Sequence, residues 1–222
     1  MEVRQATGPN GLKTQWLEFG DMVDLEEFDR ILKTTRSIRR KLDFKREVPM
    51  SVIEECVDVA VQAPVGLGGE NWRFIVVKDV AVKRELSNIY NEVLRDIVSE
   101  REIELKPTHR ALMDRLHEIP CMILACVVGE PGENPGQQTA FYGSILPAVW
   151  SLMLALRARD IGATWTTLLS SRQAQVGQLL GIPGGVTQTV MLPVAYTKGA
   201  VLRVADRLPA KKVIYLDRWG EK

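Results

Sequence analysis

Two stretches of the sequence are most informative about the fold: CMILACVV at residues 121–128 and QQTAFYGSILPAVWSLMLAL at residues 137–156. The first is a run of eight apolar residues ended by Gly129, which predicts a central strand buried on both faces of a sheet. The second carries no charged residue and predicts a helix, over about residues 138–159, that is apolar on all sides. Its glutamines, serines and Pro147 make it too weakly apolar for a membrane span, so we expect a core helix of a soluble protein.

A helix that is apolar all round needs cover on every side, which one domain of 222 residues does not readily supply. Burial against a second copy in a homodimer is one solution, and we hold it as a hypothesis. A gel-filtration mass close to the 24.9 kDa of one chain would count against it.

Helices and one strand are expected before the central strand. Residues 1–20 look like an irregular arm, and Asp24 suits the N-cap of a helix that ends near Thr35. A second helix is expected over residues 50–62, begun either by Pro49 or by a capping box of Ser51 with Glu54. Its predicted inner face consists of Val52, Cys56, Val59 and Ala60. A short strand at residues 74–77 and an amphipathic helix over residues 80–104 follow.

The part after the uncharged helix predicts two more strands, a helix and a short final strand. Residues 163–169 are rich in β-formers, and a helix over residues 171–180 is closed by Gly181. Further strands are expected at residues 187–195 and 212–215. The order predicts a single α+β domain over residues 1–222, with a mixed or antiparallel central sheet sandwiched by helices.

Composition excludes several classes of function. Lys and Arg number 29 against 28 Asp and Glu, so nothing favours a nucleic-acid or membrane-surface partner. The three cysteines, Cys56, Cys121 and Cys126, lie in apolar stretches and read as buried thiols of a reducing cytosol. His109 and His117 lack metal-ligand spacing, so no metal site is expected. The N-terminus lacks a signal-peptide pattern, so we expect a cytoplasmic protein.

Three motifs stand out as candidates for chemistry. TTRSIRR at residues 34–40 offers three arginines and a serine to an anion such as phosphate, unless it is a solvated basic turn. APVGLGGENWRF at residues 63–74 lets the backbone approach a flat ligand or a partner chain closely, unless it is only a flexible connection. RVADRLP at residues 203–209 supplies further cations for the same anion, with a surface loop as the alternative.

Together these motifs resemble the FMN-dependent nitroreductase family. TRSIR at residues 35–39 is similar to the family's R-R-S-x-R motif, and residues 63–74 are similar to its A-P-S-x-x-N-x-Q-P-W-R-F stretch. The likeness continues through FYGSILPAVW at 141–150, IGATWTT at 161–167, LLGIP at 179–183 and the tail at 213–219. It covers about residues 25–220, and it implies the nitroreductase fold, FMN as cofactor and a dimer with FMN at the interface.

The resemblance also implies roles for particular residues. Arg36 and Ser37 would hold the FMN phosphate and nearby ribityl oxygens, and Arg39 would reach the N1/O2 edge of the flavin ring. Arg207 matches the family's late phosphate-binding arginine, and Arg203 is a second candidate. Residues at the strand end, whose backbone would lie near flavin N5, are Thr166, Thr167 and Leu168. The loop at residues 63–72 would act on or near the flavin of the partner subunit.

The second motif departs from the family pattern. The family's Ser, Asn, Gln and Pro are here Val65, Gly68, Glu70 and Asn71. Replacement of the Asn by Gly68 removes a hydrogen bond to the flavin worth about 1 kcal/mol. We therefore expect either weaker FMN binding or a replacement hydrogen bond from Asn71 or from backbone groups. Glu70 would either lower the flavin potential or contact substrate.

The implied activity is transfer of electrons from NAD(P)H through flavin N5 to a nitroaromatic or quinone-like acceptor, by a ping-pong mechanism without a catalytic protein nucleophile. No G-x-G-x-x-G follows a strand, so no Rossmann site is expected. Reductive dehalogenation or substrate dehydrogenation on the same scaffold, a non-catalytic flavin-binding protein, and an interaction protein that has lost FMN are the alternatives. A lid at residues 91–117, where the family varies its substrate cover, would decide whether a different flavin reaction takes place. Five residues of this segment could contact an anionic substrate there: Arg95, Arg101, Lys106, His109 and Arg110. The alternative is that they form a solvated charged helix face.

Overall fold

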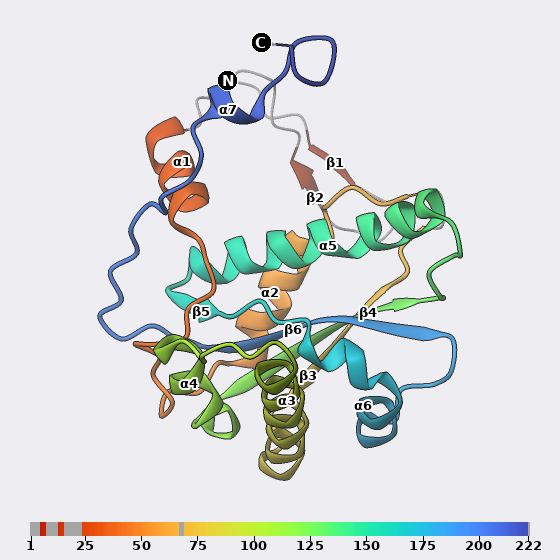
Figure 1. Ribbon diagram of the computed structural model, residues 1–222. Coiled ribbons are helices and arrows are strands. Elements are labelled where there is room, and N and C mark those ends of the chain that lie inside the picture. Colours follow the sequence, from red (N-terminus) through yellow and green to blue (C-terminus); the bar gives the residue numbers. More distant parts are fainter. Residues whose placement is uncertain (1–4, 8–12, 16–23, 67–68, 222) are drawn as a thin grey trace.

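The computed structural model describes residues 5–7, 13–15, 24–66 and 69–221 of the chain. Within the expected irregular arm, β1 (Gln5–Thr7) and β2 (Lys13–Gln15) pair as a short antiparallel ladder; the rest of that arm lies outside the described residues. Figure 1 shows a central sheet with helices on both sides. The expected α+β sandwich is confirmed.

The sheet has four strands in the order β3-β4-β6-β5, and every neighbouring pair is antiparallel. Its strands are β3 (Trp72–Val77), β4 (Cys121–Val128), β5 (Ile161–Ala163) and β6 (Val186–Tyr196). The predicted central strand matches β4 in its bounds and in its position between two neighbours. The strand predicted at residues 187–195 is also confirmed: β6 contains all of these residues and is longer by one residue at each end.

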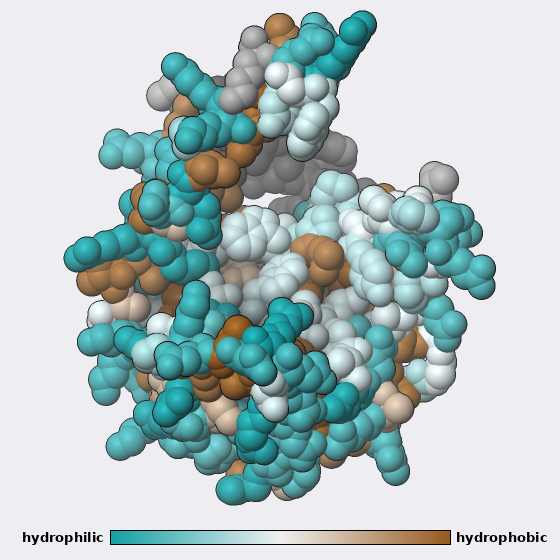
Figure 2. All heavy atoms as spheres, viewed as in Figure 1, coloured by the Kyte–Doolittle hydropathy of each residue, from teal (hydrophilic) through white to brown (hydrophobic). Residues whose placement is uncertain are grey.

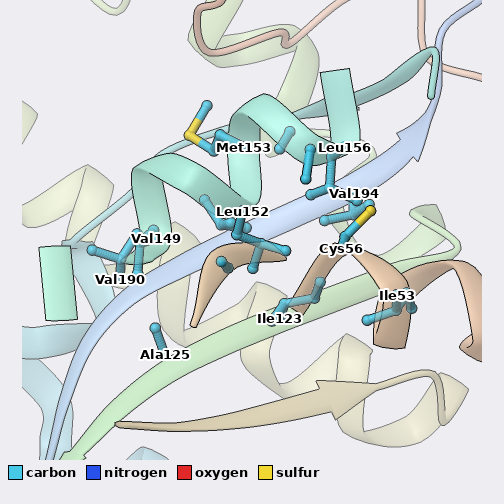
Figure 3. Packing of buried hydrophobic residues seen from close by; sticks show 14 of the residues in the cluster. Ile53, Cys56, Ile123, Ala125, Val149, Leu152, Met153, Leu156, Val190 and Val194 are labelled. Carbon is cyan, nitrogen blue, oxygen red and sulfur yellow. The ribbon is translucent and has the colours of Figure 1, made fainter. Parts of the chain in front are cut away.

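Both faces of β4 are covered, which explains its unbroken apolar sequence. The odd-numbered residues, such as Ile123 and Ala125, pack in one cluster with α2 (Met50–Ala60) and α5 (Pro135–Arg157). Figure 3 shows this cluster, in which Leu152 and Leu156 of α5 meet the sheet. The even-numbered residues, such as Leu124, pack in a second cluster on the opposite face. Successive side chains of a strand point to opposite faces, so β4 links the two halves of the core.

Five further helices and two short 3-10 turns complete the described part of the chain. The second cluster is covered by α3 (Val80–Glu100), α4 (Pro107–Met113), η1 (Leu116–Glu118) and α6 (Gln173–Leu180). The 3-10 turn η2 (Leu168–Arg172) precedes α6. α1 (Leu25–Thr34) begins at the predicted cap, since the Asp24 carboxylate accepts from the Glu27 N–H at 3.0 Å. α7 (Ala210–Val213) lies near the end of the chain, above α1 and the body in Figure 1.

Only one stripe of α5 is buried within a single chain, mainly in its C-terminal half. Its first six residues are exposed, and the side chain of Trp150 is 38% exposed. Among the described residues, α5 is the one helix long and apolar enough to cross a membrane by length and composition, and 39% of its most apolar window is buried against the protein. The uncovered apolar surface is what the homodimer hypothesis would bury.

Some local predictions were wrong. Residues 212–215 do not form a strand: none of the described strands pairs with them, and Pro209 instead begins the short helix α7. Residues 163–169 form a strand only at their start: β5 ends at Ala163, a single bridge joins Thr166 to Met191, and η2 follows. The helix expected to reach residue 104 ends at Glu100.

The start and the inner face of α2 also differ from the prediction. Pro49 is the N-cap, so Ser51 lies inside the first turn and no side-chain cap forms. The buried stripe consists of Ile53, Cys56 and Ala60, whereas Val59 is 49% exposed. Adjacent helical positions differ by about 100° around the axis, so one residue of error moves a side chain off the core face.

All three cysteines are buried, as expected. Burial raises the pKa of the Cys121 thiol to about 12 and that of Cys126 to about 11. Desolvation also raises the pKa of Cys56, opposed by the nearby charge of Arg159. Because the thiolate is the reactive form, these groups are poor nucleophiles in the folded chain.

We expect native protein at pH 8 to resist alkylation by iodoacetamide, since a pKa of about 11 leaves only about 0.1% of the Cys126 thiol ionised. Intact-mass measurement checks this, with the same protein in guanidinium chloride as the control that gains three labels. Rapid labelling of the native protein at any of the three positions would show that the thiol is accessible and contradict the burial.

Candidate functional site

The segment that follows α1 runs beside the end of β5. The Ile38 N–H donates to the Ala163 carbonyl at 2.9 Å, and the Thr164 hydroxyl donates to the Ile38 carbonyl at 2.7 Å. The Trp165 N–H donates to the Ser37 hydroxyl oxygen at 2.9 Å. The first motif and the 161–167 motif are therefore in direct contact, although more than 120 residues separate them in sequence.

Arg36 joins the first motif to the third. Its guanidinium donates to the carbonyl oxygen of Arg203, and its Nε donates to the Thr34 carbonyl at 3.4 Å. Arg36 and Arg207 line one depression of about 380 Å³, between the end of α1 and residues 204–207. Arg203 contributes its backbone to this contact, and its side chain is exposed. The structure thus brings cations from both ends of the chain together.

Arg39 lies half-buried next to this segment. Its Nε atom is fully buried and has no hydrogen-bond partner among the described residues. Burial lowers the pKa of the Arg39 guanidinium, and the nearby Tyr90 opposes that shift. The pKa of His109 is lowered by burial and then by the charges of Arg39 and Lys106. A buried guanidinium donor without an acceptor fits a ligand that brings its own acceptor atoms.

The predicted strand end turns sharply at Thr167. Thr166 is buried and exchanges two backbone hydrogen bonds with Met191, at 3.1 and 2.9 Å. The Leu168 N–H donates to the Thr166 hydroxyl at 3.4 Å, and the Leu168 side chain packs on the core. Within the described part of the chain, the Thr167 N–H has no protein acceptor, and its residue is exposed. Of the three predicted residues, Thr167 is the one with a free donor.

The second motif lies elsewhere in the chain. The Asn71 carbonyl accepts from the Val128 N–H at 2.8 Å, and Asn71 lines a depression of about 410 Å³ against the start of α5. Glu70 is exposed, and Gly68 lies outside the described residues. Val128 pairs with Val186 at the start of β6, whereas Ala163 pairs with Val194 near its end. These points are roughly 25 Å apart along the strand, so one chain does not bring this motif to Arg39.

Sequence reasoning missed two features around Arg39. α4 was not predicted as a helix, although Pro107 at its first position is a usual start signal. It places Thr108 against the first motif. Tyr90 is 2% exposed and was not predicted near the site. Nothing in the sequence distinguishes a buried helix residue that lies next to a site from one that lies elsewhere in the core. No cluster of three or more potential metal ligands occurs among the described residues.

Comparison with known proteins gives consistent matches. A model of the nitroreductase family matches residues 32–196. Human iodotyrosine deiodinase 1 is 28% identical over 205 residues, covering 85% of this chain and 68% of the human protein. The chain spans 61–68% of the length of the human, mouse and fruit fly enzymes of that name.

Solved structures show the same fold. The crystal structure of oxidized iodotyrosine deiodinase bound to FMN and 3-iodo-L-tyrosine superimposes with a TM-score of 0.62 at 22% identity, covering 86% of this chain and 98% of that chain. NADPH:FMN oxidoreductase from Vibrio harveyi, complexed with NAD+, gives a TM-score of 0.68 at 14% identity, covering 87% and 78%. At these identities the likeness concerns the fold alone.

Proposed function

This chain belongs to the nitroreductase family, and from that premise we propose that it is an FMN-dependent oxidoreductase that takes electrons from NAD(P)H and passes them to a small acceptor. The observation that carries the proposal is that Arg36 lines one depression with Arg207 and a neighbouring one with Arg39, next to Ser37, whose hydroxyl oxygen accepts from the Trp165 N–H in the segment after β5. None of these three arginines forms an ion pair with another described residue. A phosphate-bearing ligand with a polar ring edge would satisfy all of them.

The donor set fits FMN. Arg36 and Arg207 would hold the phosphate in the depression that they line together. The Ser37 oxygen already accepts from Trp165, which leaves its O–H free to donate to phosphate or ribityl oxygens. Arg39, through its unpaired Nε, would reach the N1/O2 edge of the ring, and the free Thr167 N–H would face N5.

When bound, FMN would supply the hydride chemistry between NAD(P)H and the acceptor. The protein's part is binding and electrostatics. Arg39 would place a fixed positive charge at the ring edge, where negative charge develops on reduction. Because that guanidinium is held in a partly desolvated position, its field is stronger than that of a solvated cation.

We further propose that the working form is a homodimer with a flavin at each interface. Two observations support it: the apolar surface of α5 that one chain leaves open, and the separation of the second motif from Arg39 within one chain. A partner copy would cover the first and bring its own residues 63–72, including Glu70 and Asn71, towards the flavin.

Reductive dehalogenation is the second candidate, because the matching relatives include iodotyrosine deiodinases from human, mouse and fruit fly. This reaction would use the same cradle for FMN and differ in the substrate above the ring. It is tested separately, by supplying dithionite as reductant and measuring iodide released from 3-iodo-L-tyrosine.

The test of the main proposal is a spectrum followed by an anaerobic titration. We expect FMN-loaded protein to absorb at about 450 nm and to bleach when NADH or NADPH is added without oxygen. Recovery of colour on adding a quinone or nitroaromatic completes the cycle. Bleaching by dithionite alone, with iodide release, would favour the dehalogenase. Bound flavin that no donor or substrate alters would indicate a flavin-binding protein without turnover, and absence of bound flavin would refute both enzymatic proposals.

A further inference from the structure

A second depression, of about 350 Å³, lies beside the proposed phosphate site. It is formed by residues 36–41, by Thr108 of α4 and by residues 200–202 where the C-terminal segment begins. Four of the residues that line it are cations and none is acidic: Arg36, Arg39, Arg40 and Lys41. Arg36 lies on the boundary, because it also lines the depression that contains Arg207.

The cations of this depression differ from several others on the surface, which are paired. Lys33, Arg115 and Arg172 each pair with a carboxylate, at 2.5, 2.6 and 2.8 Å. Arg40 and Lys41 form no ion pair with any described residue. The net charge of the whole chain is only +1, whereas the lining of this depression holds four cations and no acidic residue. A hollow lined by one sign of charge concentrates ions of the opposite sign.

The backbone at Lys41 is held in a defined place. Lys41 has a φ of 59°, in the left-handed region, and its carbonyl accepts from the Lys198 N–H at 2.7 Å. The neighbouring Leu42 is buried and bridges to Thr197. This bond and bridge tie residues 41–42 to the chain that leads into residues 200–202.

The proposed FMN leaves this charge unneutralised. Its phosphate would lie between Arg36 and Arg207, and its ring edge would meet Arg39. A phosphate monoester carries about two negative charges at pH 7, which those arginines already balance. Arg40 and Lys41 remain beside the ring edge without a counter-charge.

We propose that Arg40 and Lys41 form a second anion subsite, which binds the carboxylate or phosphate of the molecule that exchanges electrons with the flavin. This rests on the proposed function, and it adds a substrate class: a small anionic molecule is preferred over its neutral analogue. The anion has two possible sources, a phosphate of the nicotinamide dinucleotide or an acidic group of the acceptor. Both present oxygen acceptors to a guanidinium and an ammonium group.

Equilibrium binding to oxidised, FMN-loaded protein tests the proposal without turnover. Isothermal titration compares two matched pairs, NADP+ with NAD+ and 4-nitrobenzoate with 4-nitrobenzamide. In the wild type we expect the more anionic member of at least one pair to bind about tenfold more tightly. The pair that shows the preference identifies the source of the anion.

Charge-matched variants locate the effect. The double substitution Arg40→Gln with Lys41→Gln is expected to bring the affinity ratio close to one. Lys211→Gln with Lys212→Gln removes the same charge from exposed positions of α7 and is expected to leave the ratio unchanged. If the double variant misfolds, Arg40→Gln alone is used, because it leaves the left-handed residue Lys41 intact. This single change is expected to reduce the affinity ratio within a pair about threefold.

The outcomes separate this proposal from the function itself. Equal affinity within both pairs in the wild type, or an unchanged ratio in the double variant, would overturn the subsite. The proposed function is judged on flavin colour and on its bleaching by NAD(P)H, neither of which enters these titrations. If no FMN loads, the same titrations on flavin-free protein still decide whether Arg40 and Lys41 select anions.

Discussion

Replacing Arg36 with alanine is expected to raise the dissociation constant of FMN about 100-fold, because a charge-assisted, two-pronged contact to phosphate contributes about 2 to 3 kcal/mol. The structure gives a second reason. The Arg36 guanidinium also donates to the Arg203 carbonyl, which holds the segment that carries Arg207. The alanine variant would therefore lose one cation and release the segment with the other. Equilibrium dialysis against FMN measures the effect.

Two variants accompany this measurement. Arg84→Ala removes an exposed arginine of α3 that forms no ion pair with the described residues, and it is expected to keep wild-type FMN affinity. Arg36→Lys keeps the charge but not the planar fork, and it is expected to fall between the wild type and the alanine variant. Full flavin stoichiometry in Arg36→Ala at low FMN concentration would show that the phosphate lies elsewhere.

The central architecture was predictable because its sequence signals are local. Residues 121–128 are apolar at every position, and the structure places alternate side chains of this strand in two separate clusters. Asp24 and Gly181 mark helix ends by their own chemistry, as a side-chain cap and as a left-handed residue with φ of 64°. Such features depend on a few neighbouring residues and little on the rest of the chain.

The errors lie where distant partners decide the structure. Residues 163–169 have strand composition, but only Ala163 joins the ladder with β6, and Thr166 adds a single bridge before the chain turns. Residues 212–215 contain β-branched and aromatic side chains, yet none of the described strands pairs with them. Composition predicts the tendency to form a strand, and the available edge decides whether the strand forms.

The candidate site shows the same division. The motifs around Arg36, Ser37 and Thr166 were identified from sequence, and the structure brings them into contact through Ile38 and Ala163. The unpaired Nε of Arg39 could not be predicted. It depends on burial of Arg39 next to Tyr90 of α3, a residue about 50 positions further along the chain.

Replacing Arg39 with methionine is expected to separate stability from chemistry. Without ligand, the wild-type chain holds a partly desolvated guanidinium whose Nε has no partner among the described residues. Burial lowers the folded-state pKa of this cation; the group stays protonated at every ordinary pH, so the cost to folding is constant with pH. Removing the charge should leave the flavin-free protein equally stable or about 1 kcal/mol more stable in urea unfolding.

The same Arg39→Met change should damage the reaction. Loss of the positive charge at the ring edge is expected to slow anaerobic flavin reduction by NADH or NADPH about 100-fold. In enzymes that stabilise a developing negative charge with fixed hydrogen-bond donors, removal of one donor lowers the rate by a similar factor. Stopped-flow absorbance measures the rate, with flavin occupancy fixed by saturating FMN and Arg84→Met as the exposed control. A variant that is clearly destabilised but reduced at the wild-type rate would assign Arg39 to the scaffold. Higher stability together with slow reduction would indicate a cation that the fold tolerates because the cofactor requires it.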